Sequence, residues 1–200
     1  MLRDLINLAI QLLVAVLVWR YYRARSYPEA EKYATFGPRF WTGSVDACVI
    51  WPATFLISLI LAQELSATVS TALLFLQESI WMAYTVVMHA KFGQTYGKMV
   101  CKVRVVDFKT ERAITFRQAL LREGIPIAVS CSIMVYEILL LRGDAEGRFQ
   151  ATTSGALWFL VMLQLLWFLA EAVTMLTNEK RRALHDFIAG TVVVRTNTSS

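Results

Sequence analysis

The sequence predicts an all-α membrane protein with about five transmembrane helices and a small cytoplasmic β-hairpin or sheet that the C-terminal strand joins. The first observation is composition: 56% of the 200 residues are hydrophobic and 18% are charged, whereas soluble domains are about a quarter charged. The second is that the apolar residues gather in long windows. The third is that lysine and arginine are concentrated in alternate connecting segments.

Five apolar windows approach the length of about 20 residues that a spanning helix needs. They cover roughly residues 5–19, 44–62, 67–88, 124–141 and 156–177. The first is short enough to be a signal peptide, but "RYYRAR" follows it in place of a small-residue cleavage site. That border favours an uncleaved helix. The fourth window contains Pro126 near its start, where the missing N–H costs little.

The distribution of lysine and arginine predicts the orientation. Segments 20–43 and 90–123 and the tail after residue 177 hold 17 of these residues, and the other side holds three. The positive-inside rule therefore predicts the N-terminus outside and the C-terminus in the cytoplasm. The same rule explains the net charge of +5, and the basic side is expected to meet anionic lipids. We expect no nucleic-acid partner, because no nucleic-acid module accompanies the charge.

The cytoplasmic segments have their own predicted structure. Residues 100–115 alternate between apolar and polar side chains, which predicts a strand, the turn "KTE" and a second short strand "RAIT". Thr115 and Gln118 have the spacing of a capping box for the next helix. The run "GTVVVR", residues 190–195, follows a short amphipathic helix. Because a lone hairpin is marginal in water, we expect this run to pair with it.

Three segments are expected along the chain. Residues 1–35 form an N-terminal transmembrane helix and a basic linker. Residues 36–195 form the main membrane domain, with the cytoplasmic hairpin and tail. Residues 196–200 are expected to be a disordered end.

Three blocks of sequence carry a family resemblance. They are "RFWTGSVDACV", "TYGKMVCKVRVVDFKTERAITFRQALLRE" and "RRALHDFIAGTVVV", and they resemble the signature blocks of the RDD family of bacterial membrane proteins. The family is named for an arginine and two aspartates. The resemblance implies that Arg39 and Asp46 share one transmembrane helix and that Asp186 is the second aspartate, with Asp107 as the alternative. One departure is Thr42-Gly43, where the family usually has an alanine.

The resemblance also implies a location in the bacterial inner membrane. One family member has been proposed to be a sodium(potassium)/proton antiporter, and others are membrane proteins of unknown role.

Carboxyl groups inside the predicted spans offer a route for ions. They are Asp46, Glu78, Glu137 and Glu171. Thr71, Thr85 and His89 share a helical stripe with Glu78, and His185 is the second histidine. Cations prefer oxygen ligands, and burial raises the pKa of a carboxyl group until it can exchange a proton for a cation. The structural alternative is that these acids are protonated and hydrogen-bond between helices.

Arg39 raises a separate question, because the start of a helix disfavours a cation unless an anion joins it. We expect Arg39 to pair with Asp186, which would leave Asp46 free for the polar interior. The alternative is that Arg39 contacts only lipid phosphate.

Enzymatic motifs are missing from the sequence. The three cysteines lack metal-ligand spacing, no serine has a nucleophile-elbow context, and "GQTYGKM" is not a complete phosphate loop. We therefore expect no enzyme activity, cofactor or metal site. The leading hypothesis is a monovalent cation (Na⁺, K⁺ or Li⁺)/proton antiporter, and the alternative is a non-transporting scaffold or accessory subunit. Either is expected to form a homo-oligomer or to join a membrane complex.

Overall fold

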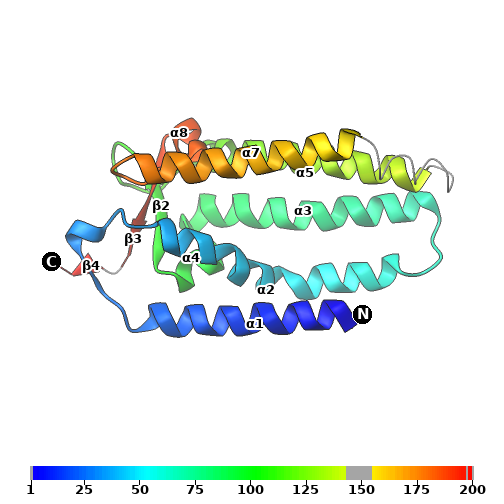
Figure 1. Cartoon of the computed structure of the whole chain (residues 1–200), viewed down its shortest axis with the longest axis horizontal. Helices are drawn as coiled ribbons and strands as arrows, with labels where there is room; N and C mark the ends of the chain where they lie inside the picture. Colours follow the sequence, from blue (N-terminus) through cyan, green and yellow to red (C-terminus); the bar gives the residue numbers. More distant parts are fainter. Residues whose placement is uncertain (1, 143–154, 197, 200) are drawn as a thin grey trace.

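The computed structural model describes residues 2–142, 155–196 and 198–199. Five long helices run roughly along the longest axis of the molecule (Figure 1). They are α1 (Leu2–Arg23), α2 (Phe36–Leu61), α3 (Ala67–Phe92), α5 (Phe116–Arg142) and α7 (Gly155–Thr177). The short elements gather at one end of the molecule, which we call the sheet end (Figure 1). These are η1 (Glu29–Glu31), α4 (Tyr96–Val100), α8 (Leu184–Ala189) and four short strands.

Four helical segments among the described residues are long and apolar enough to cross a membrane. They are Phe36–Leu61, Ala67–Phe92, Phe116–Tyr136 and Trp158–Thr177, which correspond to the second to fifth predicted windows. The first window forms α1, whose N-terminus lies at the end opposite the sheet (Figure 1). The side chains of its first residues lie outside the described part of the chain. A fifth crossing by α1 therefore stays a prediction.

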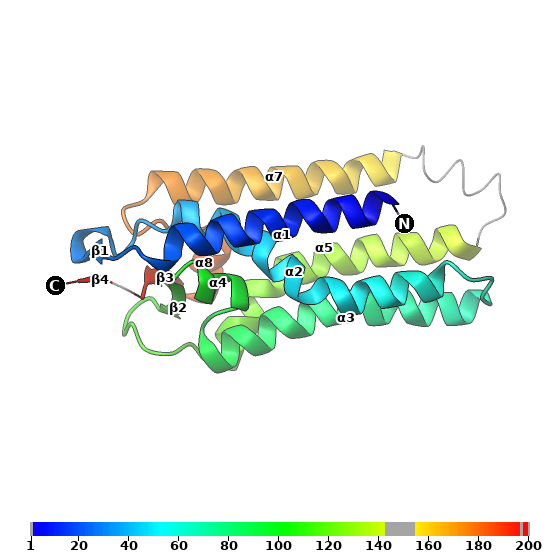
Figure 2. The ribbon, with the colours of Figure 1, turned by 90° about the horizontal axis from the view of Figure 1, so that it is seen from below.

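The long helices pack unequally. Helix α3 packs along α5, and α2 packs against α1, α3 and α4. Helix α7 touches mainly α5 and α8, and its apolar window has no buried residue. In the view from below, α7 lies at one edge of the bundle (Figure 2). This apolar helix therefore presents most of its surface to lipid or to another membrane protein.

The predicted pairing of the tail with the cytoplasmic segment is confirmed. Strand β2 (Val103–Asp107) pairs antiparallel with β3 (Thr191–Arg195), with Val105 opposite Val193. Both of these valines are fully buried. The valines of one face pack with Val18 and Tyr22 of α1, with Ile114 in the segment before α5, and with Ala119 of α5. The sheet is thus part of the core and connects the C-terminal tail to α1 and α5.

The predicted second strand of the hairpin, "RAIT", is wrong. Residues 112–115 form no strand, because Asp107 closes the turn before them. Its carboxylate accepts hydrogen bonds from the backbone N–H groups of Lys109 and Thr110 and from the side chain of Gln118. These bonds lower the pKa of Asp107 to about 2. Local polar bonds have therefore replaced strand pairing in this segment.

The predicted capping box is confirmed. The Thr115 N–H donates to Gln118 Oε1 (3.0 Å), and the Gln118 N–H donates to Thr115 Oγ1 (3.2 Å). The two bonds satisfy backbone groups that the first turn of α5 would otherwise leave without partners.

A second small pairing lies at the extreme of the sheet end. Strand β1 (Tyr27–Pro28) pairs parallel with β4 (Thr198–Ser199). This pairing falls within the segment for which the sequence predicted a disordered end.

Ending the chain after Gly190 removes β3, so we expect it to prevent stable folding. The loss would expose the edge of β2 and its buried valines, which favours aggregation. The matched control ends after Arg195, which keeps β3 and removes only β4. Yield and the monodisperse fraction in size-exclusion chromatography compare the two. Normal behaviour of the shorter chain would show that the β2–β3 pairing is dispensable.

Candidate functional site: a polar cluster at the sheet end

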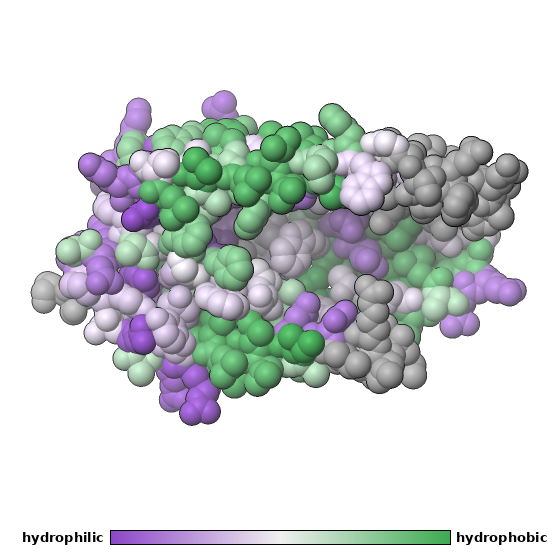
Figure 3. Space-filling view, in the orientation of Figure 1, coloured by the Kyte–Doolittle hydropathy of each residue, from purple (hydrophilic) through white to green (hydrophobic). Residues whose placement is uncertain are grey.

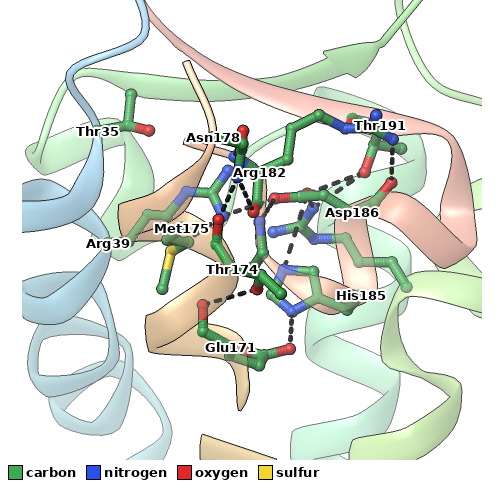
Figure 4. A network of polar contacts seen from close by, with 12 residues as sticks. Thr35, Arg39, Glu171, Thr174, Met175, Asn178, Arg182, His185, Asp186 and Thr191 are labelled. Atoms are coloured by element: carbon green, nitrogen blue, oxygen red, sulfur yellow. Dashed lines mark hydrogen bonds and ion pairs between the residues drawn. The ribbon is translucent and has the colours of Figure 1, made fainter. Parts of the chain in front are cut away.

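The carboxylate of Asp186 lies at the centre of a network of polar contacts (Figure 4). Its side chain is fully buried. Arg39 of α2 donates to Oδ2 at 2.6 Å, and Arg122 of α5 forms a close ion pair with Oδ1. The Ala183 N–H donates to Oδ2 at 2.9 Å, which caps α8, and Thr191 of β3 donates to Oδ1 at 3.0 Å. One carboxylate therefore connects two long helices, a short helix and a strand.

The pairing of Arg39 with Asp186 confirms the sequence prediction. Burial alone would raise the pKa of Asp186, but Arg122 and Arg39 outweigh it and hold the pKa well below its usual range. Asp186 is therefore ionised at neutral pH. The sequence does not reveal Arg122 as a second partner, because it is one of eight basic residues in segment 90–123. The structure places it inside a candidate span, 4% exposed.

A third arginine, Arg182, also holds the tail. Arg182 donates from Nε to the Thr191 carbonyl and from Nη2 to the Asp186 carbonyl, both at 2.9 Å. Its guanidinium lies over the rings of Phe108 and Phe187, 4.0 and 4.1 Å from their centroids. Asn178 receives the Arg182 N–H and donates to the Arg182 carbonyl. The turn from α7 into α8 is thus held by hydrogen bonds and by the contacts of one guanidinium with two aromatic rings.

Asp46 of α2 holds the connector between α3 and β2. Its Oδ1 accepts from the hydroxyl of Tyr84 (2.6 Å) and from the N–H of Gly97 (2.6 Å), and its Oδ2 accepts from the hydroxyl of Thr95 (2.7 Å). Gly97 belongs to the first turn of α4, where a carboxylate offsets the unpaired N–H groups. The prediction that Asp46 is left free for the polar interior is therefore wrong.

Gly97 lets α4 approach α2 closely. A Cβ at this position would overlap the carbonyl oxygen of Thr42 and lie 3.0 Å from Cγ of Asp46. The backbone of Thr42 is thus in close contact with α4. Gly43 differs, because a Cβ on it would meet nothing within 4 Å.

Two histidine–glutamate pairs complete the cluster. His185 of α8 is in close contact with Glu171 of α7. His89 of α3 lies with Nδ1 3.0 Å from Oε1 of Glu123 in α5. Burial lowers the pKa of His185, with Arg122 contributing, so His185 is mainly neutral at pH 7. The sequence does not single out Glu123, because the apolar window begins at the next residue, Gly124.

A cavity of about 270 Å³ lies among these groups. Its lining includes Asp46, Thr85, His89, Glu123, Glu171 and His185, together with the cations Arg39, Lys98 and Arg122. Six helices contribute to the lining, with α8 supplying His185. The cluster therefore combines proton acceptors with buried cations around a space large enough for water or a small solute.

The remaining predicted site residues lie apart from this cavity. Glu78 is half-buried on α3, and no hydrogen bond or ion pair to it occurs within the described residues. Thr71 lies two turns earlier, and its hydroxyl is buried without a partner in the described part of the chain. Glu137 belongs to α5, but its side chain lies outside the described residues. Asp107 closes the turn after β2, which is a structural role.

The fold and the cluster define a class, that of multi-pass membrane proteins in which an R–D–D set joins the helices at one end. The family model for the RDD family matches residues 33–190, so the chain belongs to the RDD family. It is 29% identical over 122 residues to the uncharacterized membrane protein YteJ of Bacillus subtilis (strain 168). That alignment covers 58% of this chain and 74% of YteJ. No solved structure matches the chain.

Gly97→Ala is expected to destabilise the protein, by about 2 kcal/mol, because the new methyl group collides with backbone atoms that cannot move independently. Gly43→Ala is the matched control, since open space surrounds that position. Alanine is a better helix former than glycine, so the control should unfold at the wild-type temperature or slightly above. Thermal unfolding in detergent measures both. Equal melting temperatures would contradict the close approach of α4 to α2.

Combining Arg39→Asp with Asp186→Arg is not expected to restore the folded yield that each single change lowers. Arg39→Asp places a second carboxylate against Asp186, and Asp186→Arg removes the shared anion of Arg39 and Arg122. Breaking a buried ion pair in either way costs about 3–5 kcal/mol. The double variant restores one pair but places an arginine at position 186 against Arg122. Folded yield should therefore stay low in all three variants. Recovery in the double variant alone would show that Arg122 contributes little to the cluster.

Proposed function

We propose that this protein crosses the bacterial inner membrane five times, with its N-terminus outside and the sheet end in the cytoplasm, and exchanges small monovalent cations for protons. The orientation is supported by the basic residues of the sheet end and by the position of the N-terminus at the opposite end (Figure 1). The observation that carries the exchange proposal is the cavity at the sheet end, because ionisable side chains from six helices line it.

The proton acceptors in this proposal are the two histidine–glutamate pairs. Glu171 and Glu123 each have a histidine beside them, so a proton entering the cavity can be held by either member of a pair. A histidine whose pKa is lowered, as at His185, releases its proton readily at neutral pH. A proton that reaches His185 is therefore held only briefly and can be passed on within the cavity.

Glu78 continues the path toward the other side of the membrane. It lies near the middle of a candidate span and has no ion pair or hydrogen bond among the described residues. A carboxyl group without a fixed partner is free to take up a proton or to meet a cation. Glu137 is the next carboxyl group in the predicted order. Asp46 is not part of this path, because its carboxylate already accepts three hydrogen bonds and holds α4 in place.

The second candidate function is a non-transporting scaffold or accessory subunit. One observation favours it, namely that the carboxylates of Asp46, Glu123, Glu171 and Asp186 all have partners within the fold. Acids used in this way hold helices together and need no transported ion. The exposed surface of α7 would then contact another subunit. Neither candidate includes a catalytic step.

Proton flux in proteoliposomes tests the first candidate. With a pH-sensitive dye inside, addition of Na⁺, K⁺ or Li⁺ is expected to change the internal pH when the wild-type protein is present. Glu78→Gln and Glu171→Gln keep the shape of the side chain but cannot release a proton, so each should reduce the initial rate at least about tenfold.

Glu64→Gln is the matched control, because Glu64 is exposed in the connection between α2 and α3. It should retain the wild-type rate, and all three variants should unfold near the wild-type temperature. A fully active Glu78→Gln variant would remove the middle step of the path. A wild-type protein that responds to none of the three cations would favour the scaffold.

A further inference from the structure

The cluster at the sheet end has a sideways opening between α2 and α7. A cavity of about 300 Å³ lies there, and it shares Arg39, Lys98 and His185 with the cavity described above. Phe40 of α2 and Phe168 of α7 line its outer part, and they are 61% and 54% exposed. Both helices are candidate membrane spans, so the opening faces the hydrocarbon near its boundary with water. The space-filling view shows the surface hollowed below the apolar band of α7, with paler and purple residues in the recess (Figure 3).

Two cations in this cavity have unused hydrogen-bond donors. Arg39 is 8% exposed, and only its Nη1 is engaged, with Asp186 and the sulfur of Met175. Its Nε and Nη2 are buried without a partner in the described part of the chain. The ammonium of Lys98 has no hydrogen bond or salt bridge there either. Burial, and then the nearby Arg122, lowers the pKa of Lys98 to about 8. Lys98 therefore remains mostly protonated at neutral pH.

Net charge alone does not select a ligand for this cavity. The cations around it are Arg39, Lys98 and Arg122, the carboxylates are Asp46, Glu123, Glu171 and Asp186, and the two histidines are His89 and His185. The hydrogen bonds decide instead. Each carboxylate has a partner within the fold, as described above, whereas Arg39 and Lys98 keep free N–H groups. Buried donors without acceptors are costly, so the cavity is suited to a group that brings oxygen acceptors.

We infer that this cavity binds the phosphate headgroup of an anionic phospholipid that enters from the membrane between α2 and α7. Arg39 Nε and Nη2 and the Lys98 ammonium donate to the phosphate oxygens, and the acyl chains lie along Phe40 and Phe168. A phosphate oxygen accepts strong, charge-assisted bonds from both groups. Basic pockets between transmembrane helices on the cytoplasmic side are suited to such headgroups. The inference rests on the candidate spans and does not depend on cation transport.

The lateral opening distinguishes a lipid from free phosphate as the source of this group. A free phosphate gains nothing from the exposed aromatic side chains, Phe40 and Phe168, that line the outer part of the cavity. A phospholipid places its phosphate and its hydrocarbon chains in matching surroundings at the same time. Bulk attraction of anionic lipids to the basic surface is a different effect, because it is not saturable at one site and needs no single lysine.

Native mass spectrometry and thermal unfolding of the purified full chain in mild detergent test the inference. Phosphatidylglycerol, phosphatidylcholine and inorganic phosphate are added separately. We expect one tightly held phosphatidylglycerol per chain and a saturable rise in melting temperature with that lipid alone. Lys98→Gln should weaken its apparent affinity at least about tenfold, the effect of losing one charged hydrogen bond. The fold should survive this change, because the Lys98 ammonium makes no salt bridge among the described residues.

Lys91→Gln is the matched control, because Lys91 is an exposed residue in the last turn of α3. It should bind phosphatidylglycerol as the wild type does. Equal affinity in Lys98→Gln and wild type would overturn the site, as would equal stabilisation by phosphatidylcholine. Saturable stabilisation by inorganic phosphate at the same lysine would overturn the lipid as the source. None of these readouts measures flux, so failure here is distinguishable from failure of the transport proposal.

Discussion

The buried carboxylate of Asp186 is the interaction on which the sheet end depends. It forms ion pairs with two arginines from different long helices, Arg39 of α2 and Arg122 of α5. Without it, two cations would remain inside the protein with no counter-charge, which is far more costly than the pair itself is stabilising. Because Asp186 also caps α8 and bonds to Thr191 at the start of β3, the ion pairs bring the tail to β2. The sheet and the helix ends are therefore one structural unit.

Asp46 plays a parallel role about two turns further along α2. It collects donors from α3, from α4 and from the residue before α4, so the connector to β2 is held against the membrane helices. The arginine and two aspartates for which the family is named, Arg39, Asp46 and Asp186, thus connect the long helices to the cytoplasmic segments. The histidine–glutamate pairs and Lys98 line the cavity beside them.

Sequence periodicity predicted what depends on local composition. The four candidate spans follow from runs of apolar residues, and β2 and β3 follow from alternation and a β-branched run. The prediction failed at "RAIT" because Asp107 offers side-chain bonds that compete with a strand, and hydropathy does not record them. It failed at Asp46 because the donors that close its carboxylate lie 38 to 51 residues further along the chain.

The sequence by itself determined the membrane class, the position of the spans and the pairing of the tail with the cytoplasmic segment, since each rests on the water-to-membrane preference or strand pattern of contiguous residues. It also singled out Arg39 and Asp186 as partners. Only the tertiary structure decided that Arg122 also pairs with Asp186 and that the Asp46 carboxylate is occupied by hydrogen bonds. The same is true of the cavity between α2 and α7 and the free N–H groups in it. Burial and ion pairing depend on distances between helices, and those distances are set by packing far along the chain rather than by neighbouring residues.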